Sequence, residues 1–167
     1  KDNVKLAIGP AIDNGFYYDF DIEQSISNDD FDKIVAKMKE IIERNEDFIR
    51  KELSREDALK LFADEPYKCE LINELDKDEI ISVYYLGEDF VDLCRGPHVE
   101  NTKFLRGFAY KINRVSGAYW KGDASKKMLQ RVYGVCFPSE EELDAHLKEL
   151  EEMEDWLEIL DILEEYK

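Results

Sequence analysis

The alternation of hydrophobic and polar residues predicts a strand near the N-terminus. Within 16–22, every second residue is apolar, and Asp19 and Asp21 fall between them. A period of two is typical of a half-buried strand, and the preceding Asp13-Asn14-Gly15 favours a hairpin turn. Further runs rich in β-branched and aromatic residues predict strands at 48–53, 80–86, 90–94, 108–112 and 128–136.

Helical spacing of apolar residues predicts three helices. The first follows Ser27 or Asn28 and carries apolar residues at positions 31, 34, 35, 38, 41 and 42. The second begins after Ser54 and is expected to end at Pro66. The third begins at Ser139, where Ser139 and Glu142 have the spacing of a capping box, and runs to about residue 165.

These elements predict an α+β fold, with an antiparallel sheet, flanking helices and a long C-terminal helix. We expect one core over residues 1–138 and a helix or linker over 139–167 that leads toward a neighbouring domain. Residue 1 is Lys rather than Met. The chain is therefore expected to be a piece of a longer protein.

Composition narrows the class of protein. Hydrophobic residues make up 44% of the chain, which is enough for a core. Charged residues make up 38%, and the sequence has no apolar run of the ~20 residues that a membrane span needs. The three cysteines, at positions 69, 94 and 136, form no Cys-x-x-Cys pair, which excludes zinc-ribbon and thioredoxin motifs. We expect reduced thiols in the cytoplasm.

Charge is distributed unevenly along the chain. A formal net charge of -17 argues against a general nucleic-acid binder. Residues 103–131, however, hold eight Lys or Arg and one acid, whereas residues 139–167 hold thirteen acids and two bases. The basic stretch could meet phosphate or form a solvated surface.

The segment "DLCRGPHV" carries the candidate chemistry. Asp92 and Cys94 are two residues apart, so a strand would place both on one face. His98 follows after Gly96-Pro97, and a bend there could return it to the same surface. Three interpretations are open at this point: two ligands of a Zn²⁺ site that needs at least three, a Cys–His nucleophilic pair, or a structural turn.

Four segments carry a resemblance to a known family. They are "KLAIGPAIDNGFYYDFD", "DLCRGPHV", "SGAYWKGD" and "MLQRVYG". In this order and spacing they resemble the second N-terminal domain of bacterial-type threonyl-tRNA synthetases. Related domains occur in alanyl-tRNA synthetases and in free-standing alanyl-tRNA editing proteins. The resemblance covers approximately residues 4–150.

The resemblance implies an editing function, the hydrolysis of mischarged Ser-tRNA(Thr). Editing is needed because a missing methyl group gives only about 10- to 200-fold discrimination. By this resemblance, Cys94 and His98 match half of the editing site, and His98 is expected to shuttle a proton or anchor water. Asp92 matches an acid that contacts substrate. Lys68 and Tyr18 match substrate-binding residues, and Lys68 is expected to hold the terminal adenosine or the developing oxyanion.

Two departures from the family pattern stand out. The family's upstream His-x-x-x-His pair is absent, since no His precedes His98, so the isolated chain is expected to have little or no activity. Cys94 and His98 alone would be an incomplete metal site, and two alternatives are open for a complete one: Zn²⁺, which related alanyl editing sites can bind, or water alone. The acidic 139–167 segment also stands where the family has a basic linker.

The resemblance also implies partners. We expect the acceptor end of tRNA(Thr), contacted by Lys121, Lys126, Lys127 and Arg131, and the rest of a synthetase chain that forms a homodimer. ATP and Mg²⁺ would belong to the absent catalytic domain, and no membrane is involved. The alternatives are a free-standing trans-editing aminoacyl-tRNA hydrolase and a non-catalytic tRNA-docking or structural module.

Overall fold

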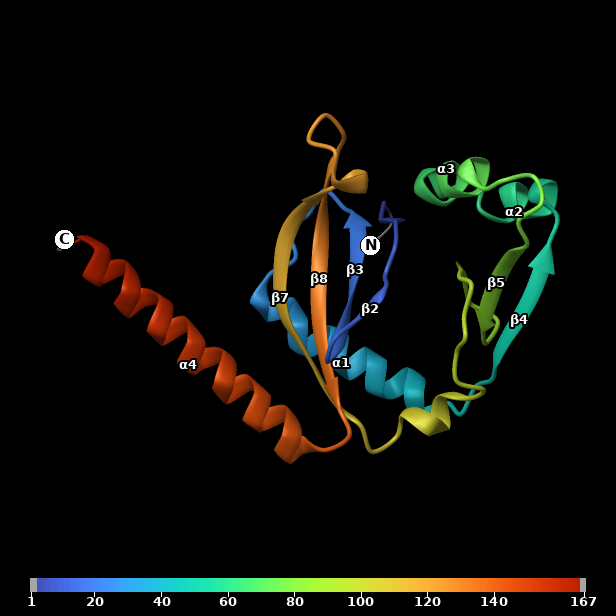
Figure 1. The fold of residues 1–167 in the computed structure, drawn as a ribbon. Helices are drawn as coiled ribbons and strands as arrows, with labels where there is room; N and C mark the ends of the chain where they lie inside the picture. The colour runs from blue at the N-terminus through green and yellow to red at the C-terminus, as the bar shows by residue number, and fades with distance from the viewer. Residues whose placement is uncertain (1–2, 166–167) are drawn as a thin grey trace.

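The computed structural model describes residues 3–165, which form two antiparallel sheets, four α-helices and two short 3-10 helices. The α+β class and the long C-terminal helix are confirmed. The strands form two separate sheets, one in the centre and one on the right of Figure 1, instead of the single sheet that we expected. In chain order the elements are β1 (Lys5–Leu6), β2 (Ala11–Ile12), β3 (Gly15–Asp21), α1 (Asn28–Glu43), β4 (Phe48–Leu53), α2 (Arg55–Leu61), α3 (Pro66–Glu74), β5 (Ile81–Leu86), β6 (Phe90–Leu93), η1 (Thr102–Leu105), β7 (Ala109–Tyr119), η2 (Trp120–Gly122), β8 (Met128–Phe137) and α4 (Glu140–Glu165).

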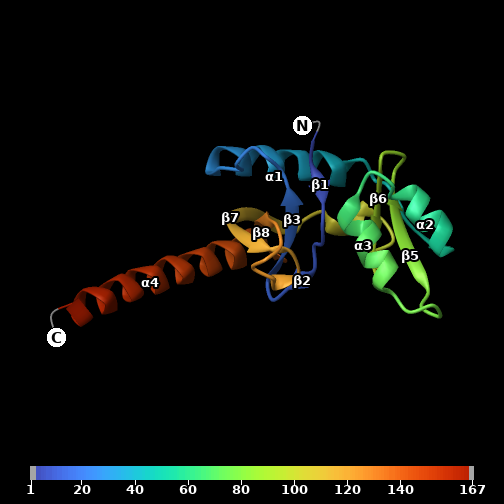
Figure 2. The same ribbon diagram turned by 90° about the horizontal axis from the view of Figure 1, so that it is seen from above.

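The first sheet has the strand order β1-β3-β8-β7, with β2 paired to β3. Helix α1 packs across one face of this sheet (Figure 2). Phe31 of α1 is buried there with Ile112 of β7 and Val132 of β8. This contact explains the sequence pattern, because the apolar stripe of α1 meets the apolar positions of strands with period two.

The second sheet has the order β4-β5-β6 and is covered by α2 and α3. Its core contains Ala58 of α2, Ile72 of α3 and Val83 of β5, each fully buried. Helix α3 was missed from the sequence. Pro66 begins α3, rather than ending α2, which already ends at Leu61. Proline is well accommodated in the first helical turn, because its missing N–H has no partner there in any helix.

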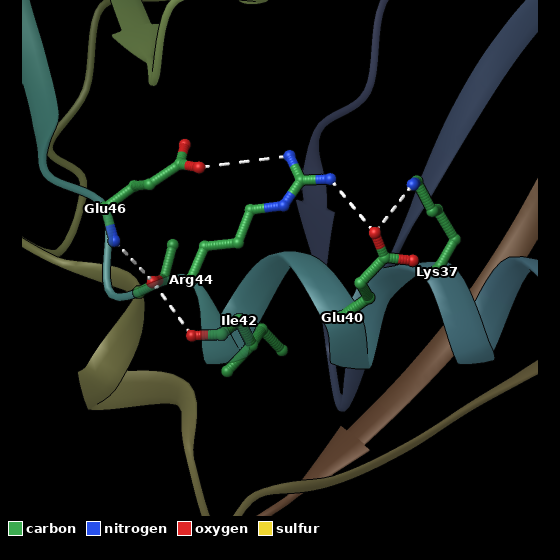
Figure 3. A network of polar contacts seen from close by, with 6 residues as sticks. Lys37, Glu40, Ile42, Arg44 and Glu46 are labelled. Carbon is green, nitrogen blue, oxygen red and sulfur yellow. Dashed lines mark hydrogen bonds and ion pairs between the residues drawn. The ribbon is translucent and has the colours of Figure 1, made fainter.

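Polar contacts link the end of α1 to the start of β4 (Figure 3). Glu40 accepts hydrogen bonds from Lys37 at 3.0 Å and from Arg44 at 3.1 Å, and Arg44 lies 3.8 Å from Glu46. Thr102 of η1, which is 1% exposed, donates to the Ile42 carbonyl and accepts from the Glu46 N–H. The buried threonine therefore fixes the short loop between α1 and β4.

Helix α4 contacts the rest of the molecule mainly through its first turns. Leu143 is buried with Ala109 and Val135, and Leu147 packs beside them. Farther along, Met153, Trp156, Leu157, Ile159, Leu160, Ile162 and Leu163 are exposed, and Figure 1 shows α4 extending away from both sheets. Across residues 3–165, each helix is too short or too polar to cross a membrane.

Candidate functional site

A buried lysine connects the two sheets at their facing sides. Lys68 of α3 is 2% exposed. Its Nζ forms an ion pair with Asp92 of β6 and donates a hydrogen bond to Tyr18 Oη of β3 at 3.0 Å. Tyr18 Oη in turn donates to Asp92 Oδ2 at 2.7 Å. Three residues from three elements therefore form one closed polar cluster.

The charges of this cluster are balanced by its own members. A buried ammonium group is tolerated when a carboxylate pairs with it, and Asp92 supplies that carboxylate. Burial, followed by the charge of Asp92, raises the pKa of Tyr18 well above its ordinary value of 10.0. Tyr18 therefore stays protonated, and its O–H donates the hydrogen bond to Asp92. Lys68 uses two of its three N–H donors in the cluster, which leaves one for a ligand.

The Cys94 and His98 side chains meet directly. His98 Nε2 lies 3.0 Å from Cys94 Sγ. The intervening turn depends on Gly96, whose φ of +82° lies in the left-handed region that favours glycine. The Gly96 N–H also donates to Cys94 Sγ at 3.3 Å. The bend after β6 thus returns the imidazole to the thiol, as the sequence pattern suggested.

His98 is partly exposed, but the burial that it has lowers the pKa of its imidazole, and the carboxylate of Asp92 opposes this effect less strongly. The imidazole is therefore neutral at pH 7, since its ordinary pKa is 6.5. A neutral imidazole can accept a proton from water, whereas a charged one cannot. The arrangement is suited to general-base chemistry.

One cavity of about 620 Å³ contains both groups. Tyr18, Lys68, Asp92, Cys94 and His98 all line it. The five candidate site residues, which are spread over 81 positions of the sequence, therefore face one space. Its remaining wall is mostly apolar and is formed by Ile8, Gly9, Pro10, Phe48, Leu71, Tyr84, Leu86, Phe90, Leu93 and Arg95.

Two residues of this wall, Gly9 and Tyr84, were not predicted as site residues from the sequence. Gly9 lies directly on the Tyr18 ring, where an added Cβ would come within 2.0 Å of a ring carbon. Tyr84 of β5 lies beside His98, with ring centroids 4.1 Å apart. A Gly-Pro pair normally indicates a turn, and a tyrosine within an apolar run normally indicates core. No local sequence signal distinguishes these positions.

If Cys94 and His98 were metal ligands, the site would need further ligands. A protein zinc site needs three or four protein ligands. Within residues 3–165, no group of three His, Cys, Asp or Glu side chains is placed to hold a metal ion. The second histidine, His146 of α4, packs against Phe137 of β8. The two residues by themselves do not fit a zinc ion.

The predicted tRNA-binding lysines on the β7–β8 side are paired within the chain. Lys121 forms ion pairs with Glu70 and Glu74 of α3, and Lys126 lies 3.6 Å from Glu70. The indole N–H of Trp120 also donates to Glu70 at 2.9 Å. These contacts fasten α3, and with it Lys68, to the first sheet.

The other two basic residues of that group are also paired. Lys127 lies 2.7 Å from Asp21, and Arg131 donates two hydrogen bonds, of 2.8 and 2.9 Å, to Asp19. Asp19 is only 3% exposed, so Arg131 compensates a buried charge. A phosphate would have to compete with these carboxylates, and tRNA contact by the four residues stays a prediction.

Comparison with known proteins finds one similar family and several similar relatives. Residues 81–133 match the family described as the threonyl and alanyl tRNA synthetase second additional domain. The threonine–tRNA ligase of Clostridium perfringens strain SM101 is 57% identical over 148 residues, which are 89% of this chain and 23% of that protein. The threonine–tRNA ligase of Staphylococcus aureus strain JH9 is 50% identical over 150 residues, which are 90% of this chain and 23% of that protein.

The chain thus spans 23% of the length of these relatives. The matched family segment contains β5, β6, β7 and the first part of β8, and so includes Asp92, Cys94 and His98. Residues 81–133 are therefore similar to the threonyl and alanyl tRNA synthetase second additional domain, and most of the chain is similar to a segment of threonine–tRNA ligases.

Proposed function

We propose that the chain is the editing part of a threonyl-tRNA synthetase, which hydrolyses the ester bond of mischarged Ser-tRNA(Thr). The observation that carries this proposal is the single cavity that holds the Lys68–Asp92–Tyr18 cluster beside the Cys94–His98 pair. The similarity to threonine–tRNA ligases favours an editing domain within a synthetase over a free-standing hydrolase.

Each side chain would have a distinct role in ester hydrolysis. The neutral His98 would take a proton as water attacks the carbonyl carbon, and the bond from that carbon to the ribose oxygen would then break as the proton passes from His98 to the ribose oxygen. Asp92 would attract the substrate ammonium group. The free N–H of Lys68 would stabilise the developing oxyanion or hold the terminal ribose. The products would be serine and a free 3′-terminal ribose.

The chain supplies only part of such a site. Its histidines are His98 and His146, and His146 lies on α4, packed against Phe137. The family's additional His-x-x-x-His pair would have to come from a segment outside this sequence. We therefore propose that the isolated chain has little or no hydrolytic activity, although it presents the binding residues.

A hybrid protein tests this function. In the hybrid, the matched residues of this chain replace the corresponding 148-residue segment of the Clostridium perfringens ligase. We expect it to hydrolyse Ser-tRNA(Thr) faster than Thr-tRNA(Thr), as measured by release of radiolabelled amino acid. A hybrid that ligates threonine normally but hydrolyses neither ester, or both equally, would contradict the proposal.

A further inference from the structure

The imidazole of His98 is held chiefly by aromatic rings. Among the residues that the structure describes, its hydrogen-bond partner is Cys94, whose Sγ lies 3.0 Å from His98 Nε2. The Tyr84 ring lies 4.1 Å from the imidazole, centroid to centroid, at an interplanar angle of 45°, and the Phe48 ring lies 5.5 Å from it at 25°. A single hydrogen bond fixes neither the plane nor the tilt of an imidazole. The two rings restrict both.

Tyr84 also contacts the turn that carries His98. A Cβ added to Gly96 would lie 2.0 Å from Tyr84 Oη, so the phenol rests against the backbone of this glycine. The ring of Tyr84 therefore faces the imidazole while its hydroxyl faces the bend between Cys94 and His98. One side chain supports both the ring and the backbone that positions it.

The position of Tyr84 itself is well fixed. It lies in β5, the central strand of the second sheet, directly opposite Arg50 of β4 and Asp92 of β6. Its neighbour Val83 is fully buried in the core below the sheet. Tyr84 therefore projects from the opposite face, which lines the cavity. A paired central strand with a packed core is a rigid support for a site residue.

We propose that Tyr84 is a positioning residue that orients the His98 imidazole toward the scissile ester. This inference rests on the proposed hydrolysis and extends it to a residue that does not itself react. Tyr84 acts through His98: its ring sets the imidazole plane, and its bulk limits the access of water to one side of that ring. The ring, rather than the hydroxyl, carries this role.

Proton NMR of the isolated chain tests the proposal and does not require the chain to be enzymatically active. The chain has two histidines, so His146→Asn assigns the His98 signals. In the unchanged chain, we expect nuclear Overhauser effects between the Tyr84 and His98 ring protons. Tyr84→Leu should shift the His98 ring signals and raise the His98 pKa toward its ordinary value, because the imidazole becomes more hydrated. Tyr84→Phe should preserve both.

A neighbouring tyrosine provides the matched control. Tyr85→Leu removes a ring of the same size from the other face of β5, where Tyr85 packs against the core. It should lower stability while leaving the His98 signals in place. The proposal is overturned if the unchanged chain lacks the Overhauser effects, if Tyr84→Phe alters His98 as much as Tyr84→Leu, or if Tyr85→Leu does so equally.

The hybrid separates failure of this inference from failure of the proposed function. Tyr84→Leu should lower kcat for Ser-tRNA(Thr) hydrolysis by about 10- to 100-fold, with a smaller change in KM, because misplacement of a reacting group slows the chemical step. An active hybrid whose kcat is unchanged by Tyr84→Leu refutes the positioning role alone. An inactive hybrid whose His98 signals still respond refutes the hydrolytic function alone.

Discussion

Replacing Asp92 with asparagine is expected to lower the free energy of unfolding by about 3 kcal/mol. The reason is the burial of Lys68, whose side chain is 3% exposed and pairs with Asp92. Asparagine preserves the shape of aspartate but removes its charge, so the ammonium group is left buried without a counter-ion. Urea denaturation, followed by far-ultraviolet circular dichroism, measures this loss.

Two further variants separate this effect from general damage. Glu79→Gln removes the partner of Arg95, whose side chain is 81% exposed, and should change stability by less than about 0.5 kcal/mol. Lys68→Met combined with Asp92→Leu removes both buried charges and should recover much of the loss. A loss for Asp92→Asn that is no larger than the loss for Glu79→Gln would contradict the buried ion pair.

Replacing His98 with alanine is expected to lower Ser-tRNA(Thr) hydrolysis by the hybrid about 10²- to 10⁴-fold, the usual contribution of a general base. The unchanged hybrid should lose activity as the pH falls through the His98 pKa. This midpoint should lie below the ordinary value of 6.5, because burial favours the neutral imidazole. Single-turnover deacylation at several pH values measures both effects.

His146 is the matched control for this substitution, because it is the other histidine of the chain and packs on α4 against Phe137. His146→Ala should leave hydrolysis unchanged. Ligation of threonine by the hybrid should be normal in both variants, since the proposed role of His98 is confined to editing. Equal hydrolysis by the His98→Ala and unchanged hybrids would remove His98 from the mechanism.

Local patterns predicted most elements but not their assembly. Alternation identified β3 (Gly15–Asp21), and helical spacing identified α1, because each signal lies within a few neighbouring residues. The division into two sheets could not be predicted, since pairing depends on contacts between distant segments. Helix α3 was missed because Pro66 was interpreted as a helix end, whereas proline also occupies helix starts.

The site was predictable where its residues are close in sequence. Asp92, Cys94 and His98 share one segment, and strand periodicity placed the first two on one face. Lys68 came only from the family resemblance, because nothing local shows that α3 brings it against Asp92, which lies 24 positions away. Nothing in the sequence identified Tyr84 as a site residue, since a tyrosine is equally common in a hydrophobic core.

The basic stretch shows a different limit of sequence reasoning. Eight bases against one acid within 103–131 suggested either a phosphate-binding or a solvated surface. The tertiary structure brings acids from elsewhere in the chain to this stretch, such as Glu70 for Lys121 and Asp19 for Arg131. A local charge count omits these partners, so the net charge of the folded surface differs from that of the stretch.

The central claim is that one cavity, lined by Tyr18, Lys68, Asp92, Cys94 and His98, binds the serylated end of tRNA. Its most direct test is an NMR titration of the chain with serine joined by an amide bond to 3′-amino-adenosine, an analogue that cannot be hydrolysed as an ester. We predict saturable shifts of the His98 ring signals that Asp92→Asn abolishes, while the His146 signals stay unchanged. Unmoved His98 signals at high analogue concentration, or shifts that persist in Asp92→Asn, would contradict the claim.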